Sequence, residues 1–260
     1  MFELNGLRVL VTGATGHLGS AMSWALAEAG ANVLVNSRSA DKAERLVRAL
    51  LEAGLKAEPA IFDALDETSI RKYAELNAGK DITALVNNAY AGKSGSIELS
   101  TSEEYMESYQ ISVAAAHSIV RILLSAFRLS VARHGYASII NLGSMYGLVS
   151  PDQRIYENAA SVNPPFYGAA KAALIHWTKY AACEFGKEGI RFNSVSPGPF
   201  PSEAVQDANG EFVKILADRV PLGRIGQACE IGGPIVFLAS RASSFVNGSN
   251  LAVDGGWTSW

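Results

Sequence analysis

The sequence has few of the residues that build metal sites or disulfide frameworks. Only two of its 260 residues are cysteine, Cys183 and Cys229, and they form no CxxC pair. The four histidines are scattered without metal-ligand spacing, so we expect no bound metal. A disulfide could join the two cysteines, but so low a cysteine content fits a reducing compartment better.

Charge runs and long apolar runs are also missing. The net charge is -3, from 22 basic and 25 acidic residues with no long run of either sign. Because nucleic-acid binding needs a basic footprint, we expect no nucleic-acid partner. No uninterrupted apolar run approaches the ~20 residues of a membrane span, and the N-terminal residues lack the order of a signal peptide. We therefore expect a soluble, cytoplasmic protein with no membrane partner.

The chain instead alternates short β-type runs with alanine-rich helical stretches. With 48% hydrophobic and 18% charged residues, it can bury the core of one domain over residues 1–260. Strands that are apolar almost throughout are covered on both faces. The pattern thus predicts an α/β fold, a doubly wound, Rossmann-type parallel sheet of about seven strands with helices on both faces. The expected strands cover residues 7–12, 32–37, 57–62, 83–88, 138–143, 190–195 and 250–255.

A glycine-rich segment, TGATGHLG, directly follows the first expected strand. In such a sheet, ligands bind beyond the carboxyl ends of the strands. Gly13 allows a tight turn, Gly16 lets the backbone approach a pyrophosphate, and Gly19 allows the next helix to pack closely. That helix offers unpaired N–H groups to the phosphates, and His17 need not touch them. We predict a dinucleotide site, although the motif alone could be a structural turn.

Tyr167 and Lys171 lie at i and i+4 of a helix expected over residues 166–186. A phenol has a pKa of about 10, which burial raises and which a lysine ammonium nearby lowers by about one to three units. The pair can therefore exchange protons with a substrate near neutral pH. Ser144, after the fifth expected strand, could supply a hydroxyl to the substrate oxygen. Each feature also has a purely structural explanation: Tyr167 and Lys171 could be ordinary side chains of an amphipathic helix, and Ser144 could be a turn residue.

Together these motifs resemble a short-chain dehydrogenase/reductase of the single-domain branch, from about residue 5 to the C-terminus. The resemblance implies that Tyr167 is the general acid/base and that Ser144 orients the reacting oxygen. Lys171 would hold the nicotinamide ribose and lower the tyrosine pKa. The resemblance is carried by TGATGHLG, Asp63, NNA at 87–89, Ser144, Tyr167 with Lys171, SPG at 196–198 and VDGG at 253–256.

The same resemblance implies a set of cofactor contacts. Ser37 stands where family members that use NAD carry an aspartate, and Arg38 beside it can bind a 2′-phosphate. NADP(H) is therefore favoured, with NAD(H) as the alternative, since Arg38 could also stack on the adenine or point into water. The cofactor-binding residues implied are Gly13, Thr15, Gly16, Leu18, Gly19, Ser37, Arg38, Asp63, Ala64, Asn88, Ala89, Tyr167, Lys171, Pro197, Gly198 and Phe200.

Three positions depart from the family pattern. His17 replaces a usual glycine, and Ser112 replaces an asparagine that supports a proton-relay water. Tyr90 follows NNA where glycine is usual, which places a phenol near the cofactor edge or against the following helix. Because of His17 and Ser112, a catalytically impaired NAD(P)-binding sensor or assembly protein remains the alternative to an enzyme.

The segment between Ser144 and Tyr167 is longer than is typical, polar and proline-bearing, as a substrate-side loop would be. NNAY, SMYGLVSP and IYE are similar to flagellin-modification and other sugar-pathway members of the family. We expect hydride transfer between a nicotinamide cofactor and a carbonyl or secondary alcohol. The similarity suggests that a sugar or sugar derivative bears this group, and steroids, acyl-carrier substrates and simple ketones stay open. Candidate substrate contacts are Tyr90, Tyr146, Arg154 and Tyr156. By resemblance, helices at about 101–133 and 165–186 would pack against a second subunit, so that the protein would be a homodimer or homotetramer.

Overall fold

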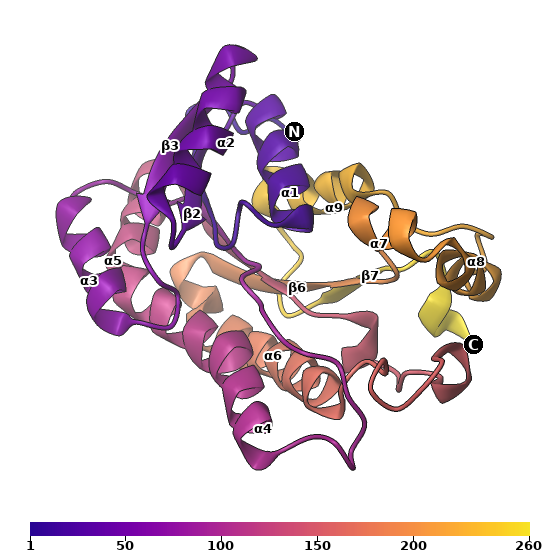
Figure 1. The fold of residues 1–260 in the computed structure, drawn as a ribbon. Helices are drawn as coiled ribbons and strands as arrows, with labels where there is room; N and C mark the ends of the chain where they lie inside the picture. The colour runs from indigo at the N-terminus through magenta and orange to yellow at the C-terminus, as the bar shows by residue number, and fades with distance from the viewer.

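A computed structural model describes all 260 residues of the chain. Its strands form one parallel sheet in the order β3-β2-β1-β4-β5-β6-β7. In Figure 1, β2 and β3 lie toward one side of the molecule and β6 and β7 toward the other. The predicted doubly wound, Rossmann-type sheet is therefore confirmed, and the expected strand ends shift by only a residue or two. The strands are β1 (Arg8–Val11), β2 (Asn32–Ser37), β3 (Lys56–Ile61), β4 (Ala84–Asn87), β5 (Ala137–Leu142), β6 (Ile190–Pro197) and β7 (Asn250–Val253).

Helices cover both faces of this sheet because successive strand residues point to opposite sides. Val9 and Val11 of β1 pack with α1, α2 and α9, whereas Leu10 packs with α3, α5 and α6 on the other face. The helices are α1 (His17–Glu28), α2 (Ala40–Glu52), α3 (Glu67–Leu76), α4 (Ser102–Tyr109), α5 (Ala115–His134), α6 (Pro165–Phe185), α7 (Glu203–Ala208), α8 (Gly210–Arg219) and α9 (Gly232–Ala239).

The stretch from α4 to α5 is one long helical segment with a π-helical turn at Gln110–Ala114. It begins at a capping box, in which the Thr101 hydroxyl accepts from the Glu104 backbone N–H and the Glu104 carboxylate accepts from the backbone N–H of Thr101. Residues 102–134 are long and apolar enough to cross a membrane by length and composition, with 44% of the apolar window buried in the fold. A buried core helix of a water-soluble protein passes the same test, so this segment is weak evidence for a membrane span.

Candidate active site

The glycine-rich turn connects β1 to α1 and can only be built with glycine at two of its positions. Gly13 has φ +60°, in the left-handed region, and a Cβ on Gly19 would lie 2.2 Å from the carbonyl oxygen of Gly13. The N-cap of α1 is Gly16, without a side-chain cap or an acidic residue in the first turn. The first N–H groups of α1 therefore remain available to an anion. His17 is exposed at the first helical position and does not fill the turn.

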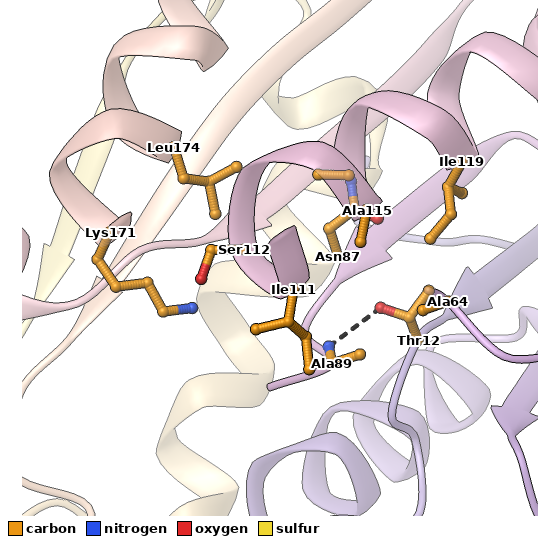
Figure 2. A pocket seen from close by; sticks show the side chains of 11 residues that line it. Thr12, Ala64, Asn87, Ala89, Ile111, Ser112, Ala115, Ile119, Lys171 and Leu174 are labelled. Atoms are coloured by element: carbon orange, nitrogen blue, oxygen red, sulfur yellow. Dashed lines mark hydrogen bonds between the residues drawn. The ribbon is translucent and has the colours of Figure 1, made fainter. Parts of the chain in front are cut away.

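The end of β4 is tied directly to this turn. The Asn88 side-chain amide donates to the carbonyl oxygens of Thr12 (3.0 Å) and Gly13 (3.1 Å). In return, the Thr12 hydroxyl accepts from the backbone N–H groups of Asn88 (2.9 Å) and Ala89 (3.1 Å), the latter drawn in Figure 2. These bonds fix the NNA segment against the glycine turn.

A groove of about 710 Å³ runs from this turn over the carboxyl ends of β2 and β3. Arg38 is 75% exposed at its rim, with its guanidinium 4.0 Å from the Asp63 carboxylate. Lys42, in the first turn of α2, also lines the groove. We did not predict it, although a basic residue four positions after Arg38 could have been identified from the sequence. The groove takes in the predicted cofactor contacts Gly13, Thr15, Gly16, Leu18, Gly19, Ser37, Arg38, Asp63, Ala64, Asn88 and Ala89.

The predicted residues at the end of β6 and just after it lie outside the lining of this groove. The Gly198 N–H donates to the Val253 carbonyl (3.0 Å), and a Cβ on Gly198 would lie 2.5 Å from Cα of Asp254. Phe200 packs closely on Gly226. Pro197, Gly198 and Phe200 are thus held against β7 and the neighbouring loop at the carboxyl edge of the sheet.

Lys171 and Tyr167 project from α6, as their spacing predicted. Lys171 is 4% exposed and its Nζ donates to the Leu142 carbonyl oxygen at 2.7 Å. The same Nζ lies 5.7 Å from the centre of the Tyr167 ring. Burial lowers the pKa of Lys171 to about 8.

Ser144 completes the predicted catalytic set at the end of β5. It caps the short helical turn at Met145–Gly147 by accepting from the Tyr146 N–H at 3.1 Å. Burial raises the pKa of Tyr167, a hydrogen bond with Ser144 opposes that rise, and the neighbouring Tyr90 phenol adds slightly to it. In the fold, burial has the larger effect on the Tyr167 pKa, so its direction is upward, and the lowering expected from Lys171 stays a prediction.

Tyr90 lies against both Tyr167 and Lys171. The Tyr90 ring meets the Tyr167 ring edge-on, with 4.9 Å between the ring centres. The Lys171 Nζ lies 5.1 Å from the centre of the Tyr90 ring. The Tyr90 hydroxyl is 3.2 Å from that of Ser108. Tyr90 thus contacts the helix that follows it, α4, through Ser108, and it also lines the groove. Ser108 was not predicted, and nothing in the local sequence marks it.

Ser112 lies in the π-helical turn and lines a small cavity with Asn87, Lys171 and Leu174 (Figure 2). Its buried hydroxyl has no hydrogen-bond partner within the protein. Asn87 donates to Asn141 at 2.8 Å, across β4 and β5. The cavity therefore brings an unpaired hydroxyl to the side of the buried lysine.

The other three candidate substrate contacts, Tyr146, Tyr156 and Arg154, lie in two separate places. The hydroxyls of Tyr146 and Tyr156 are 3.0 Å apart, in an apolar cluster that also contacts Tyr167. Arg154 instead turns outward and pairs with Asp152 at 2.8 Å. It lines a separate hollow with Trp257 and Trp260.

Known proteins resemble the chain along almost its whole length. Residues 13–258 match a family profile described as Enoyl-(Acyl carrier protein) reductase. A gluconate 5-dehydrogenase of Gluconobacter oxydans (strain 621H) is 34% identical over 268 residues, covering 99% of this chain and 97% of that protein. A galactitol 2-dehydrogenase of Rhizobium johnstonii (strain DSM 114642 / LMG 32736 / 3841) is 33% identical, covering 100% and 98%.

Among solved structures, the chain is similar to a gluconate 5-dehydrogenase from Burkholderia cenocepacia J2315 in complex with NADP and tartrate. The TM-score is 0.86 at 31% identity, covering 100% of this chain and 98% of that one. Fold and site together define a Rossmann-type, dinucleotide-dependent oxidoreductase. The chain belongs to the short-chain dehydrogenase/reductase family, and it acts on CH–OH and C=O groups with an NAD(P) cofactor.

Proposed function

We propose that this protein is an NADP(H)-dependent dehydrogenase of a sugar acid or polyol, with Ser144, Tyr167 and Lys171 as its catalytic residues. One observation carries the proposal: a lysine without any acidic partner is buried beside a tyrosine, and Tyr90, which contacts both, lines the groove of about 710 Å³. Burying an unpaired ammonium destabilises a fold, so its retention favours a catalytic role.

In the proposed reduction, the Tyr167 hydroxyl donates its proton to the substrate carbonyl oxygen. In oxidation, the Tyr167 phenolate accepts the alcohol proton. The Ser144 hydroxyl holds that same oxygen, and the Lys171 ammonium favours the phenolate and would bind the nicotinamide ribose. The nicotinamide cofactor, when bound, supplies or accepts the hydride.

NADP(H) is the cofactor that we propose, with NAD(H) as the weaker alternative. Ser37 at the end of β2 carries no carboxylate to repel a 2′-phosphate, and Arg38 and Lys42 beside it are cationic. The solved gluconate 5-dehydrogenase of Burkholderia cenocepacia is a complex with NADP. A second similar structure, the Pseudomonas aeruginosa RhlG/NADP active-site complex, has a TM-score of 0.87 at 28% identity.

A polyhydroxylated substrate is supported by the site and by the relatives. The paired hydroxyls of Tyr146 and Tyr156 offer hydrogen bonds to neighbouring hydroxyl groups beside Tyr167. The curated relatives include enzymes named for gluconate, galactitol and 2-dehydro-3-deoxy-D-gluconate. Arg154 is a weaker candidate for a substrate contact, because it is exposed and already paired with Asp152.

We also propose that the whole chain acts as one domain in a cytoplasmic homodimer or homotetramer. Strands from Arg8 to Val253 share one sheet, which supports a single unit. The predicted contact helices expose Met106 and Tyr109 before the π-helical turn and Tyr180 on α6. Large exposed apolar side chains of this kind suit burial against a second subunit.

The test is a fluorescence titration with NADPH and with NADH, followed by turnover assays on gluconate and galactitol with NADP⁺. We expect tighter binding of NADPH and turnover of at least one polyol. Tyr167→Phe should abolish turnover and change the NADPH dissociation constant less than about threefold. Cofactor binding without turnover of any carbonyl or alcohol would favour the sensor alternative, and binding of neither cofactor would contradict both.

A further inference from the structure

Lys171 carries a charge that few groups in the fold offset. Its ammonium makes one hydrogen bond, to the Leu142 carbonyl oxygen, and no salt bridge. Two aromatic rings also face it, Tyr90 at 5.1 Å and Tyr167 at 5.7 Å from Nζ to ring centre, and the neutral Ser112 hydroxyl lies across the small cavity. A cation over an aromatic face within about 6 Å is attracted by the ring quadrupole. The nearer of these rings belongs to Tyr90.

Tyr90 is held in this position from two sides. The Ser108 hydroxyl donates to the Phe166 carbonyl oxygen (3.2 Å), so it is free to accept from the Tyr90 hydroxyl, also 3.2 Å away. The edge-on contact with Tyr167 fixes the ring from the α6 side. A Cβ on Gly92 would lie 2.6 Å from the Tyr90 hydroxyl oxygen, so the chain after Tyr90 folds closely over it.

The charged and titratable groups near this cluster are few. Tyr167 lies on the same helix as Lys171, and Tyr146 lies beyond Tyr167 on the side of β5. Glu107, on α4, lines the groove beside Tyr90 but makes no salt bridge with Lys171. On the outer side of Tyr90, Lys93 and Glu104 pair with each other at 3.6 Å. No carboxylate therefore compensates the charge of Lys171.

We propose that Tyr90 is a positioning residue of the acid/base pair: its ring face keeps the Lys171 ammonium charged and directed beside Tyr167. The role is specific to the aromatic ring, and the hydroxyl serves only as its anchor on Ser108. The inference deepens the proposed function and rests on it, because a charged Lys171 matters to turnover only where Tyr167 transfers the proton.

The test compares Tyr90→Leu with Tyr90→Phe in the full-length protein. Leucine fills much of the same space without a ring quadrupole, whereas phenylalanine keeps the ring and loses only the hydroxyl. The readout is the pH profile of kcat/KM for NADP⁺-dependent oxidation of gluconate or galactitol, whichever the wild type turns over. Thermal unfolding and NADPH titration of each variant report folding and cofactor binding separately.

We expect Tyr90→Leu to move the apparent pKa of the rising limb upward by about half a unit to one unit. Loss of the ring leaves Lys171 less charged, so Tyr167 gives up its proton only at higher pH. Tyr90→Phe should stay within about 0.2 units of wild type, because the ring that it keeps carries the interaction. A packing defect alone would lower kcat without moving this limb.

Two results would overturn the inference, and they can be told apart. An active wild type with an unshifted Tyr90→Leu profile, or an equal shift in Tyr90→Phe, removes the role of the ring and leaves the proposed function intact. A wild type that binds NADPH but turns over neither polyol, or an active Tyr167→Phe, removes the proposed function and the role of Tyr90 with it.

Discussion

The side-chain amide of Asn88 donates a hydrogen bond to the carbonyl oxygen of Gly13 over 3.1 Å, and so joins the end of β4 to the glycine turn. The same amide also reaches the carbonyl oxygen of Thr12. One side chain thus satisfies two carbonyl groups in a segment that has left the sheet ladder. The shape of the proposed phosphate cradle therefore depends on a residue from a different strand.

Replacing Asn88 by alanine should weaken both the fold and cofactor binding. Two carbonyl groups would lose their donor, which should lower the free energy of unfolding by about 1–3 kcal/mol. NADPH affinity should fall about three- to thirtyfold as the turn loosens. Chemical denaturation and fluorescence titration measure the two effects. Asn77→Ala is the control: Asn77 donates to Tyr73 at the end of α3, so its loss should leave NADPH affinity unchanged.

Gly19→Ala should be more disruptive than its single added methyl group suggests. The new Cβ would lie 2.2 Å from the Gly13 carbonyl oxygen and 3.0 Å from Cα of Ala14, both backbone atoms. Either α1 or the turn must shift, at a cost of about 1–3 kcal/mol. Gly210→Ala is the matched control, because no atom lies within 4 Å of a Cβ at that position. An NADPH affinity equal to that of Gly210→Ala would contradict the close packing of the turn.

The sequence predicted what depends on local spacing, and it missed what depends on contacts between distant segments. The glycine turn, its place at the carboxyl edge of the sheet and the α6 spacing of Tyr167 and Lys171 follow from short motifs on a regular fold. The contact of Tyr90 with Lys171 joins the end of β4 to α6. Its anchor on Ser108 comes from a third element, α4. No periodicity in the sequence indicates that Tyr90, Lys171 and Ser108, from three separate segments, contact one another.

The effect of burial on the Tyr167 pKa could not be ranked from the sequence for a related reason. From the sequence, the distance to Lys171 was foreseeable but the depth of burial was not. In the fold, burial is the largest influence on the pKa of both residues, raising that of Tyr167 and lowering that of Lys171. The sequence therefore identified the two residues without ranking the opposing effects on them.

Arg38→Ala should weaken NADPH binding about tenfold or more and leave NADH binding within about twofold, because only NADPH carries the 2′-phosphate. Lys42→Ala should act in the same direction but less strongly. Both losses should shrink as salt rises, since screening weakens exposed charge pairs. Arg45→Ala serves as the control, because Arg45 is paired with Asp41 along α2 and does not line the groove. An equal loss for NADH and NADPH would contradict the 2′-phosphate assignment.

Lys171→Met should abolish turnover and yet stabilise the protein at neutral pH. Burial lowers the Lys171 pKa from 10.5 to about 8. Below pH 8 both folded and unfolded states bind the proton, so the penalty for the buried ammonium is fully present. Between about pH 8 and 10.5 the unfolded state binds more protons, so the stability of the wild type increases as pH rises.

The methionine variant lacks the penalty, but it leaves the Leu142 carbonyl oxygen without its donor. We expect a net gain of about 1–3 kcal/mol at pH 7 that narrows toward pH 10. Denaturant unfolding of both proteins at pH 7, 8, 9 and 10 measures this difference, with Lys72→Met, an exposed lysine on α3, as the control. A difference that is constant with pH would mean that Lys171 is not the group that titrates.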